Sequence, residues 1–144
     1  MLSEKLDRIA NLDVIKVLVD TLKSHEGDII LLNQNQLNKD GTVDINNPGQ
    51  KLQYSEKYIP RKQKFATFKN TDFIDLHAMG IFQENMKLIF FENYFVIQDT
   101  DLKWANFLEP QERFTNALGL TEESKSELRD LVRDDFIKAF KEIL

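Results

Sequence analysis

The sequence predicts an α+β domain with helices at both ends and a small antiparallel β region between them. Apolar residues recur at helical spacing from Ser3 to about Lys23. Two runs rich in β-branched and aromatic residues, Met86–Phe91 and Tyr94–Gln98, are separated by two residues, which is typical of a β-hairpin. The stretch that begins at Thr121 has the clearest amphipathic pattern in the chain and predicts a long C-terminal helix.

The N-terminal helix is amphipathic and therefore needs a partner for its apolar stripe. The stripe repeats at intervals of three, four or six residues and consists of Leu2, Leu6, Ile9, Ile15, Leu18 and Leu22. The pattern allows an interruption near Asn11–Asp13. The apolar run Ile29–Leu32 follows Gly27 and fits either a buried strand or more helix, because periodicity does not separate the two over four residues. We expect a strand there.

The segment Asn33–Gln53 is mostly polar and is expected to form an exposed or flexible loop. Asp40-Gly41 and Asn47-Pro48-Gly49 each mark a turn within it. A loop of about 20 residues is long for a compact domain, and such loops are usually functional or disordered. We therefore expect part of this segment to become ordered only on binding.

The C-terminal helix carries start signals as well as an apolar stripe. Thr121 is a good N-cap, and Glu122 and Glu123 place negative charge in the first turn, where the helix dipole favours it. The stripe consists of Leu128, Leu131, Val132, Phe136, Ala139, Phe140 and Ile143. We expect this face to pack on the remainder of the domain.

Size and composition predict one soluble domain over residues 1–144. Its 42% hydrophobic content with 11 phenylalanines excludes wholesale disorder. No apolar run approaches the roughly 20 residues that span a bilayer, and the start of the chain lacks a signal-peptide pattern. We therefore expect a cytoplasmic protein without membrane contact. The lack of cysteine excludes disulfides, thiolate metal sites and cysteine nucleophiles.

Residues 51–70, the basic segment, reverse the charge of an acidic chain. The segment has a net charge of +5 within a chain of net charge −5, from Lys51, Lys57, Arg61, Lys62, Lys64 and Lys69 against Glu56. Four aromatic residues are interleaved with these charges, namely Tyr54, Tyr58, Phe65 and Phe68. Such a segment either meets an acidic partner, protein or nucleic acid, or forms a solvated strip whose aromatic rings face inward.

The spacing of the aromatic residues favours the protein-facing interpretation. Tyr54 and Tyr58 are four residues apart, and Phe65 and Phe68 are three apart, so helical geometry would turn each pair towards the core. A pI near 5.1 also predicts weak sequence-independent affinity for nucleic acid at physiological salt. A single-strand binding groove, with cations on phosphates and rings on bases, is the alternative.

Structural roles explain the candidate metal ligands better than metal binding does. The loop around Asp40-Gly41 superficially follows a calcium loop, but Gln36 and Asn47 stand where the decisive carboxylates are needed. On a strand, Asp75 and His77 would face one side and Asp72 the other, which favours surface or capping roles.

A second acidic pair follows the predicted hairpin. Asp99 and Asp101 are expected to end the second strand and to cap a short helix. On that helix, Trp104, Phe107 and Leu108 would share one face. We therefore predict no catalytic residue, no metal site and no cofactor.

Several short motifs occur in a definite order along the chain. They are Leu31–Leu37, Tyr54-Ser55-x-x-Tyr58, Asp75-Leu76-x-x-Met79-Gly80-x-Phe82, the hairpin, Asp99-Thr-Asp101-x-Lys103 and Leu118-Gly119-Leu120-Thr121. This order resembles small structural proteins of tailed phages and prophages, of the virion morphogenesis or tail-completion type. The resemblance covers roughly Ile29 to Phe140, and Met79 departs from it by standing where the pattern has Thr. It implies an α+β subunit without enzymatic activity that assembles at the neck or tail end of a virion.

We accordingly expect a non-enzymatic assembly protein in head–tail joining or tail completion. Its expected partners are other virion proteins and copies of itself, first in the bacterial host cytoplasm and then in the virion. The predicted partner-binding residues are Lys51, Tyr54, Lys57, Tyr58, Arg61, Lys62, Lys64 and Lys69. The alternative is a nucleic-acid-binding accessory module that uses residues 51–70. A metal-dependent enzyme is the third hypothesis, with Asp72, Asp75, His77, Asp99 and Asp101 as its ligands.

Overall fold

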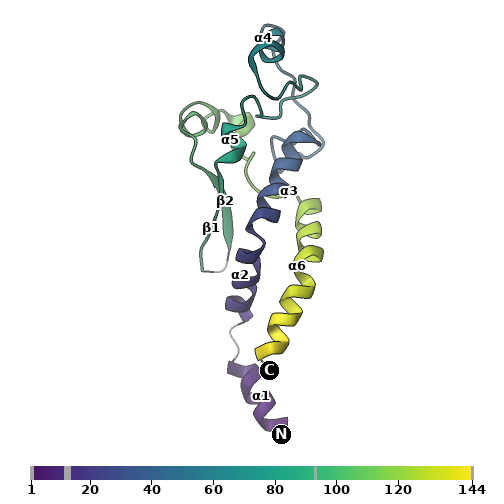
Figure 1. Cartoon of the computed structure of the whole chain (residues 1–144), viewed down its shortest axis with the longest axis vertical. Helices are drawn as coiled ribbons and strands as arrows, with labels where there is room; N and C mark the ends of the chain where they lie inside the picture. The colour runs from purple at the N-terminus through teal and green to yellow at the C-terminus, as the bar shows by residue number, and fades with distance from the viewer. Residues whose placement is uncertain (1, 12–13, 93, 144) are drawn as a thin grey trace.

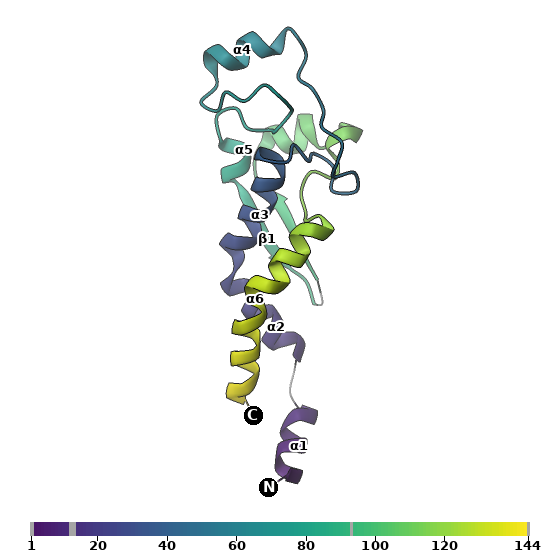
Figure 2. The ribbon, with the colours of Figure 1, turned by 90° about the vertical axis from the view of Figure 1, so that its right-hand side faces the viewer.

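The protein is an elongated α+β molecule, shown by a computed structural model that describes residues 2–11, 14–92 and 94–143 (Figure 1). Its helices and strands are, in order, α1 (Leu2–Asn11), α2 (Val14–Ser24), α3 (Glu26–Asn38), α4 (Tyr58–Phe65), α5 (Ile81–Glu84), β1 (Met86–Phe90), β2 (Phe95–Asp99), the π-helix η1 (Trp104–Leu108), the 3-10 helix η2 (Glu112–Phe114) and α6 (Glu122–Ile143). In Figures 1 and 2, α4 lies at one extremity and α1 at the other. The predicted fold class is confirmed.

The helices α2, α3 and α6 form the frame of the molecule. In Figure 1, α2 and α3 lie between the hairpin on one side and α6 on the other. The N-terminal helical prediction is confirmed by α1 and α2, and Leu12 and Asp13, where an interruption was expected, lie outside the described residues. Buried apolar residues from the frame, the hairpin and the 101–120 region form one core.

The strand predicted at Ile29–Leu32 is wrong, because these residues lie within α3. Ile29 and Leu32, three residues apart, are buried against the core, whereas Leu31 between them is 50% exposed. One buried side and one exposed side at this spacing are the helical pattern. Packing of that stripe outweighs the β preference of the isoleucine pair.

The polar segment that follows is also more ordered than predicted. Helix α3 continues to Asn38, and the amides of Asn33 and Gln36 are fully buried. The Asn33 side chain donates to Ala117 O (3.1 Å) and accepts from Gly119 N (2.9 Å). The Gln36 side chain donates to Gly119 O (2.9 Å) and accepts from Thr121 N (2.9 Å). We call these four hydrogen bonds the amide clasp, and they fasten α3 to the start of α6.

Residues 39–53 form the irregular part of the predicted loop. Thr42 and Val43 are buried, and Thr42 pairs with Lys51 in an isolated antiparallel bridge. The Thr42 hydroxyl donates to Pro48 O at 3.0 Å, which closes the turn around the predicted Asn47-Pro48-Gly49. Residues 46–51 are exposed, so the expected exposure holds for this tip.

The predicted hairpin is confirmed by β1 and β2, which pair antiparallel with Met86 opposite Asp99 and Phe90 opposite Phe95. Phe91 N donates to Tyr94 O at 2.8 Å and continues the pairing toward the turn, of which residue 93 lies outside the described residues. Buried Met86 and Ile97 belong to the core. The hairpin therefore covers one side of α3.

Helix α6 confirms the predicted C-terminal helix and its cap. Ser124 N donates to the Thr121 hydroxyl at 3.2 Å, as an N-cap requires. Leu128 and Val132 are buried against the core, but Leu131 is 49% exposed, so the buried stripe is narrower than predicted. Within the described ranges, no helix combines the length and the apolar character needed to cross a membrane.

Candidate functional site

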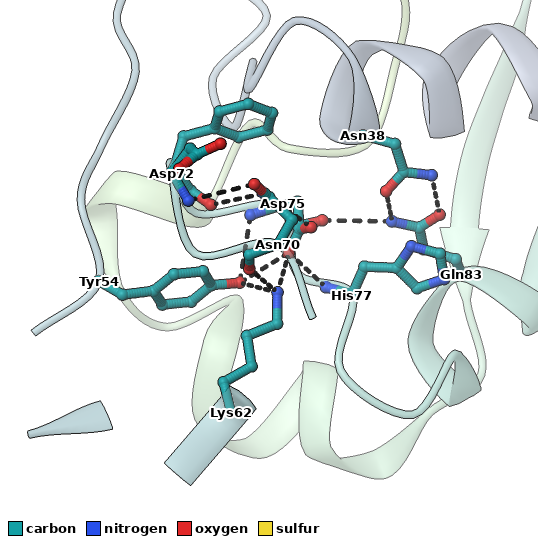
Figure 3. Close-up of polar contacts among 9 residues, drawn as sticks. Asn38, Tyr54, Lys62, Asn70, Asp72, Asp75, His77 and Gln83 are labelled. Carbon is teal, nitrogen blue, oxygen red and sulfur yellow. Dashed lines mark hydrogen bonds and ion pairs between the residues drawn. The ribbon is translucent and has the colours of Figure 1, made fainter. Parts of the chain in front are cut away.

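A buried polar cluster lies beside α4, and Figure 3 shows its side chains converging on Lys62. We define this polar hub as Tyr54, Lys62, Asn70 and Asp75. The side chains of Lys62 and Asp75 are 0% and 4% exposed. Lys62 Nζ donates to Asp75 Oδ1 (2.8 Å), to Asn70 O (2.6 Å) and to the Tyr54 hydroxyl (3.1 Å). The ammonium group therefore has a full set of acceptors inside the protein.

The carboxylate of Asp75 is equally well satisfied. Its Oδ1 also accepts the Tyr54 hydroxyl (2.7 Å) and His77 N (3.1 Å), while its Oδ2 accepts Asn70 Nδ2 (3.1 Å). Burial, reinforced by the hydrogen bond to Asp75, raises the pKa of Tyr54, so the tyrosine stays protonated and remains a donor. A buried ion pair with complete hydrogen bonding makes the loss of either partner costly.

Local chain geometry brings these residues together. Lys62 lies on the inner side of α4, and the residues on either side of it in the helix, Arg61 and Gln63, are exposed. After α4 the chain turns back, and Phe68 N donates to Ala78 O at 2.8 Å. An Asx turn follows, in which Asp72 N donates to Asn70 Oδ1 at 3.1 Å. The hub thus joins α4 to the returning 70–77 segment.

A second set of amides connects the hub to the frame (Figure 3). Gln83 Nε2 donates to Asp75 O (3.2 Å) and to Asn38 Oδ1 (2.7 Å), and Asn38 Nδ2 donates to Gln83 Oε1 (2.8 Å). Gln83 is itself buried. A continuous series of hydrogen bonds therefore links α4, through Asp75 and Gln83, to the end of α3.

A cleft of about 550 Å³, the hub cleft, opens next to this network. Its walls come from residues 53–58, 74–82 and 101–114. Buried apolar side chains form its base, among them Ile74, Phe82 and Phe114. Polar and charged side chains also line it, including His77, Lys103 and Arg113. An apolar base with a few polar groups is the usual composition of a ligand site.

Unusual backbone geometry concentrates in these same walls. Leu76 has φ 55°, a left-handed conformation that is costly for a leucine. Gly80 has φ 89°, and a Cβ placed there would lie 3.0 Å from the Phe68 ring. The lining residue Leu108 belongs to the π-helix η1. Left-handed residues and π-helical turns both occur preferentially at functional sites.

His77 is held in the wall of the cleft by an aromatic stack. Its ring lies parallel to Phe68, with centroids 3.5 Å apart and an interplanar angle of 19°. Burial lowers the pKa of His77, although the neighbouring Asp75 acts in the opposite direction. The imidazole is therefore neutral at physiological pH and offers one donor and one acceptor.

The structure divides the predicted partner-binding residues into two groups. Lys62 is buried in the hub, and the half-buried Tyr54 and Tyr58 contact each other with ring centroids 5.1 Å apart. The exposed group consists of Lys51, Lys57, Arg61, Lys64 and Lys69. Within it, Lys51 lies over the Phe73 ring, and Lys69 Nζ donates to Gln63 O at 2.8 Å. Lys62 therefore does not present its charge to a partner.

The predicted inward orientation is wrong for two of the aromatic residues. Phe65 is 67% exposed at the end of α4, and Phe68 is 39% exposed. Phe68 lies beyond the end of α4, so helical spacing does not apply to this pair. We define the basic face as Lys57, Arg61, Lys64 and Phe65.

Of the four carboxylates considered as metal ligands, those of Asp75, Asp99 and Asp101 make structural contacts. Asp75 is paired with Lys62, and Asp72 is exposed. Asp99 Oδ1 accepts Asp101 N (2.8 Å), and Asp101 Oδ1 accepts Lys103 N (3.1 Å), so the predicted capping is confirmed. In the described part of the chain, no group of three or more potential ligands is arranged to hold a metal ion.

Two further sequence predictions concern these loops. Phe107 is 68% exposed whereas Trp104 is buried, so the predicted common face is wrong for Phe107. In the calcium-like loop, Gln36 belongs to the amide clasp, and the Asp44 carboxylate accepts Asn46 N and Asn47 Nδ2, both at 2.9 Å. This is the polar turn that the sequence favoured.

The hub cleft and the ion pair beneath it were not predicted from the sequence. No local signal distinguishes Lys62 from the other five cations of the basic segment, because its partner Asp75 lies outside that segment. Comparisons with protein families, with characterised proteins and with solved structures found no match to this chain. Its function is therefore argued from the geometry described above.

Proposed function

We propose that this protein is a structural subunit of a tailed phage or prophage that acts in head–tail joining or tail completion. It would act through contacts with other virion proteins and with copies of itself, without catalysis. It would do so in the host cytoplasm during assembly and then in the virion. The order of motifs along the sequence suggests this class, and the separation of two contact surfaces supports it.

The basic face at one extremity of the molecule carries the proposal (Figure 2). Arg61 and Lys64 are exposed on α4, Lys57 is exposed directly before it, and Phe65 at its end is 67% exposed. The buried Lys62 anchors the opposite side of that helix through the hub. A rigid surface that combines charge with an exposed aromatic ring is suited to an acidic protein partner.

The other end of the molecule exposes apolar side chains. Leu2 on α1 is 74% exposed, and Ile15 on α2 is 48% exposed. An apolar groove of about 550 Å³ begins at Ile15 and is bounded by α2, the hairpin and α6. Two different surfaces, one at α4 and one along α1 and α2, permit head-to-tail contacts between subunits, which close into rings or extend into filaments.

Charge reversal on the basic face tests the proposal. We expect the Arg61→Glu/Lys64→Glu variant to keep the fold, because both side chains are exposed, and to fail in assembly. The control is Lys39→Glu/Lys87→Glu, which makes the same charge change at two other exposed positions. The assay is complementation of a gene deletion in the phage, with electron microscopy of the particles and protein identification in purified virions. Normal tailed particles with the first variant would contradict the proposal.

A specific observation also favours nucleic-acid binding as a second candidate. The exposed Phe65 and Phe68 flank a basic surface, and Lys64 Nζ lies 5.3 Å from the centroid of the Phe65 ring. Rings and cations of this kind bind single strands by stacking and phosphate contacts. Filter binding with single-stranded DNA and RNA at two salt concentrations distinguishes the candidates. Tight binding that weakens steeply with salt and is lost in Arg61→Glu/Lys64→Glu would favour this second function.

A further inference from the structure

The hub cleft has the size and the base of a small-molecule site. Its volume of about 550 Å³ falls within the range of roughly 300–1,000 Å³ that ligand pockets occupy. At its base, Ile74, Phe82 and Phe114 are each at most 6% exposed and belong to the core. Because these side chains are fixed by core packing, an apolar group bound there would meet a preformed surface.

The charged residues of the cleft are predominantly positive, although the whole chain has a net charge of −5. Lys103 and Arg113 line it, and in the described part of the chain neither has an ion-pair partner. Asp101 is the one carboxylate among the described lining residues, and its Oδ1 already accepts Lys103 N at 3.1 Å. Two cations against one carboxylate leave the described lining with a net charge of +1, which favours an anion.

Arg113 is exposed, and two local contacts orient its guanidinium group. Its guanidinium carbon lies 4.4 Å from the centroid of the Phe114 ring, and its Nε donates to Gln111 Oε1 at 3.0 Å. These contacts use one of the five N–H donors, so the terminal nitrogens remain for a carboxylate, which the guanidinium matches in shape. Its position next to Phe114 sets this cation beside the apolar base.

The wall opposite η1 and η2 is also preorganised. His77 is fixed by its stack on Phe68 and supplies a neutral donor. Leu76, with φ 55°, directly follows Asp75, whose carboxylate makes four polar contacts, three within the hub and one to His77 N. A strained residue persists only where its surroundings over-determine it, and such residues cluster at ligand sites.

We propose that the hub cleft binds a small amphipathic carboxylate. Its apolar body would cover Phe82 and Phe114, and its carboxylate would pair with Lys103 and Arg113. The same chemistry occurs in a free organic acid and in the C-terminal residue of a partner peptide. This inference does not depend on the proposed role in assembly.

The test uses 4-phenylbutyrate as the free acid and 4-phenylbutanamide as its neutral analogue. Both are titrated against the full chain by calorimetry and by NMR with methyl-labelled methionine, in which Met79 at the cleft reports binding. We expect saturable binding of the acid with a Kd below about 1 mM and at least a tenfold preference over the amide. Acetyl-Gly-Gly-Phe with a free or an amidated C-terminus forms the peptide arm, and tighter binding of one arm identifies the source of the ligand.

Variants connect the binding to the proposed residues. Arg113→Gln is expected to weaken acid binding about tenfold and to leave amide binding unchanged. Ile81→Asp, at a 51% exposed position in the cleft wall, places a repelling charge there without disturbing the core. Arg133→Gln on α6, an exposed arginine paired with Asp130, is the matched control and should bind like the parent protein. Equal affinity for acid and amide, or undiminished binding in both cleft variants, would overturn the proposal.

Discussion

The polar hub makes a quantitative prediction for Lys62→Met, which removes the ammonium group and keeps a side chain of similar length. Asp75, 4% exposed, would then remain buried without its counter-ion. Breaking a buried ion pair by removing one partner costs about 3–5 kcal/mol. The carboxylate would keep three donors, from Tyr54, Asn70 and His77. We therefore expect the lower end of that range, about 3 kcal/mol.

Urea unfolding followed by circular dichroism measures this loss as a lower midpoint with an unchanged m-value. Lys64→Met, on the exposed side of the same helix, is the control and should change the free energy of unfolding by less than about 0.5 kcal/mol. Adding Asp75→Asn to Lys62→Met removes the uncompensated charge and should restore about 1–2 kcal/mol, whereas Asp75→Asn alone should destabilise. A loss below 1 kcal/mol for Lys62→Met would refute the reasoning.

Two further predictions concern a carboxylate and a glycine. Burial raises the pKa of Asp99 from 3.8 to about 6, so the stability gained from its protonated form is fully present below about pH 4 and is lost as the pH rises through 6. Because the group is partly exposed, Asp99→Asn should stabilise the protein at pH 7 by only about 1 kcal/mol, and it should give no gain at pH 4. Urea titrations at both pH values measure this difference, and an equal effect at both would contradict the prediction. Gly80→Ala should lower the free energy of unfolding by about 1–2 kcal/mol, because φ is 89° and the new Cβ would press on Phe68. The control is Gly27→Ala in α3, where a Cβ meets nothing within 4 Å, and it should instead stabilise the protein in thermal unfolding. A similar loss of stability at both glycines would show that backbone conformation is not the cause.

Sequence signals correctly predicted the elements that depend on nearby residues, namely the capped helix α6 and the hairpin. Thr121 caps α6 as expected, and the two runs on either side of Glu92-Asn93 form the hairpin, because capping and cross-strand pairing depend on nearby residues. The run Ile29–Leu32 was misassigned since four apolar residues contain too little periodicity to separate a strand from a helix.

Long-range partners explain the remaining differences between prediction and structure. Asn33 and Gln36 have the composition of a loop, but they satisfy backbone groups more than 80 positions later in the chain. Lys62 is the same residue type as the exposed Lys57 and Lys64, and only its contact with Asp75 distinguishes it. Neither the hub nor the hub cleft is encoded by adjacent residues, so sequence reasoning could identify the basic segment without identifying which of its members faces inward.

The amide clasp also constrains how this chain can fold and change. Its four hydrogen bonds join positions 83 to 86 residues apart, so they form only after the chain has been synthesised past Thr121. Closing a loop of that length costs about 4 kcal/mol of chain entropy, whereas doubling it would add only about 0.6 kcal/mol. We therefore expect late, slow closure of the frame. Insertions at the exposed tip 46–51 would then add little to the entropy of closing the frame, so this part of the chain is free to diverge while the frame persists.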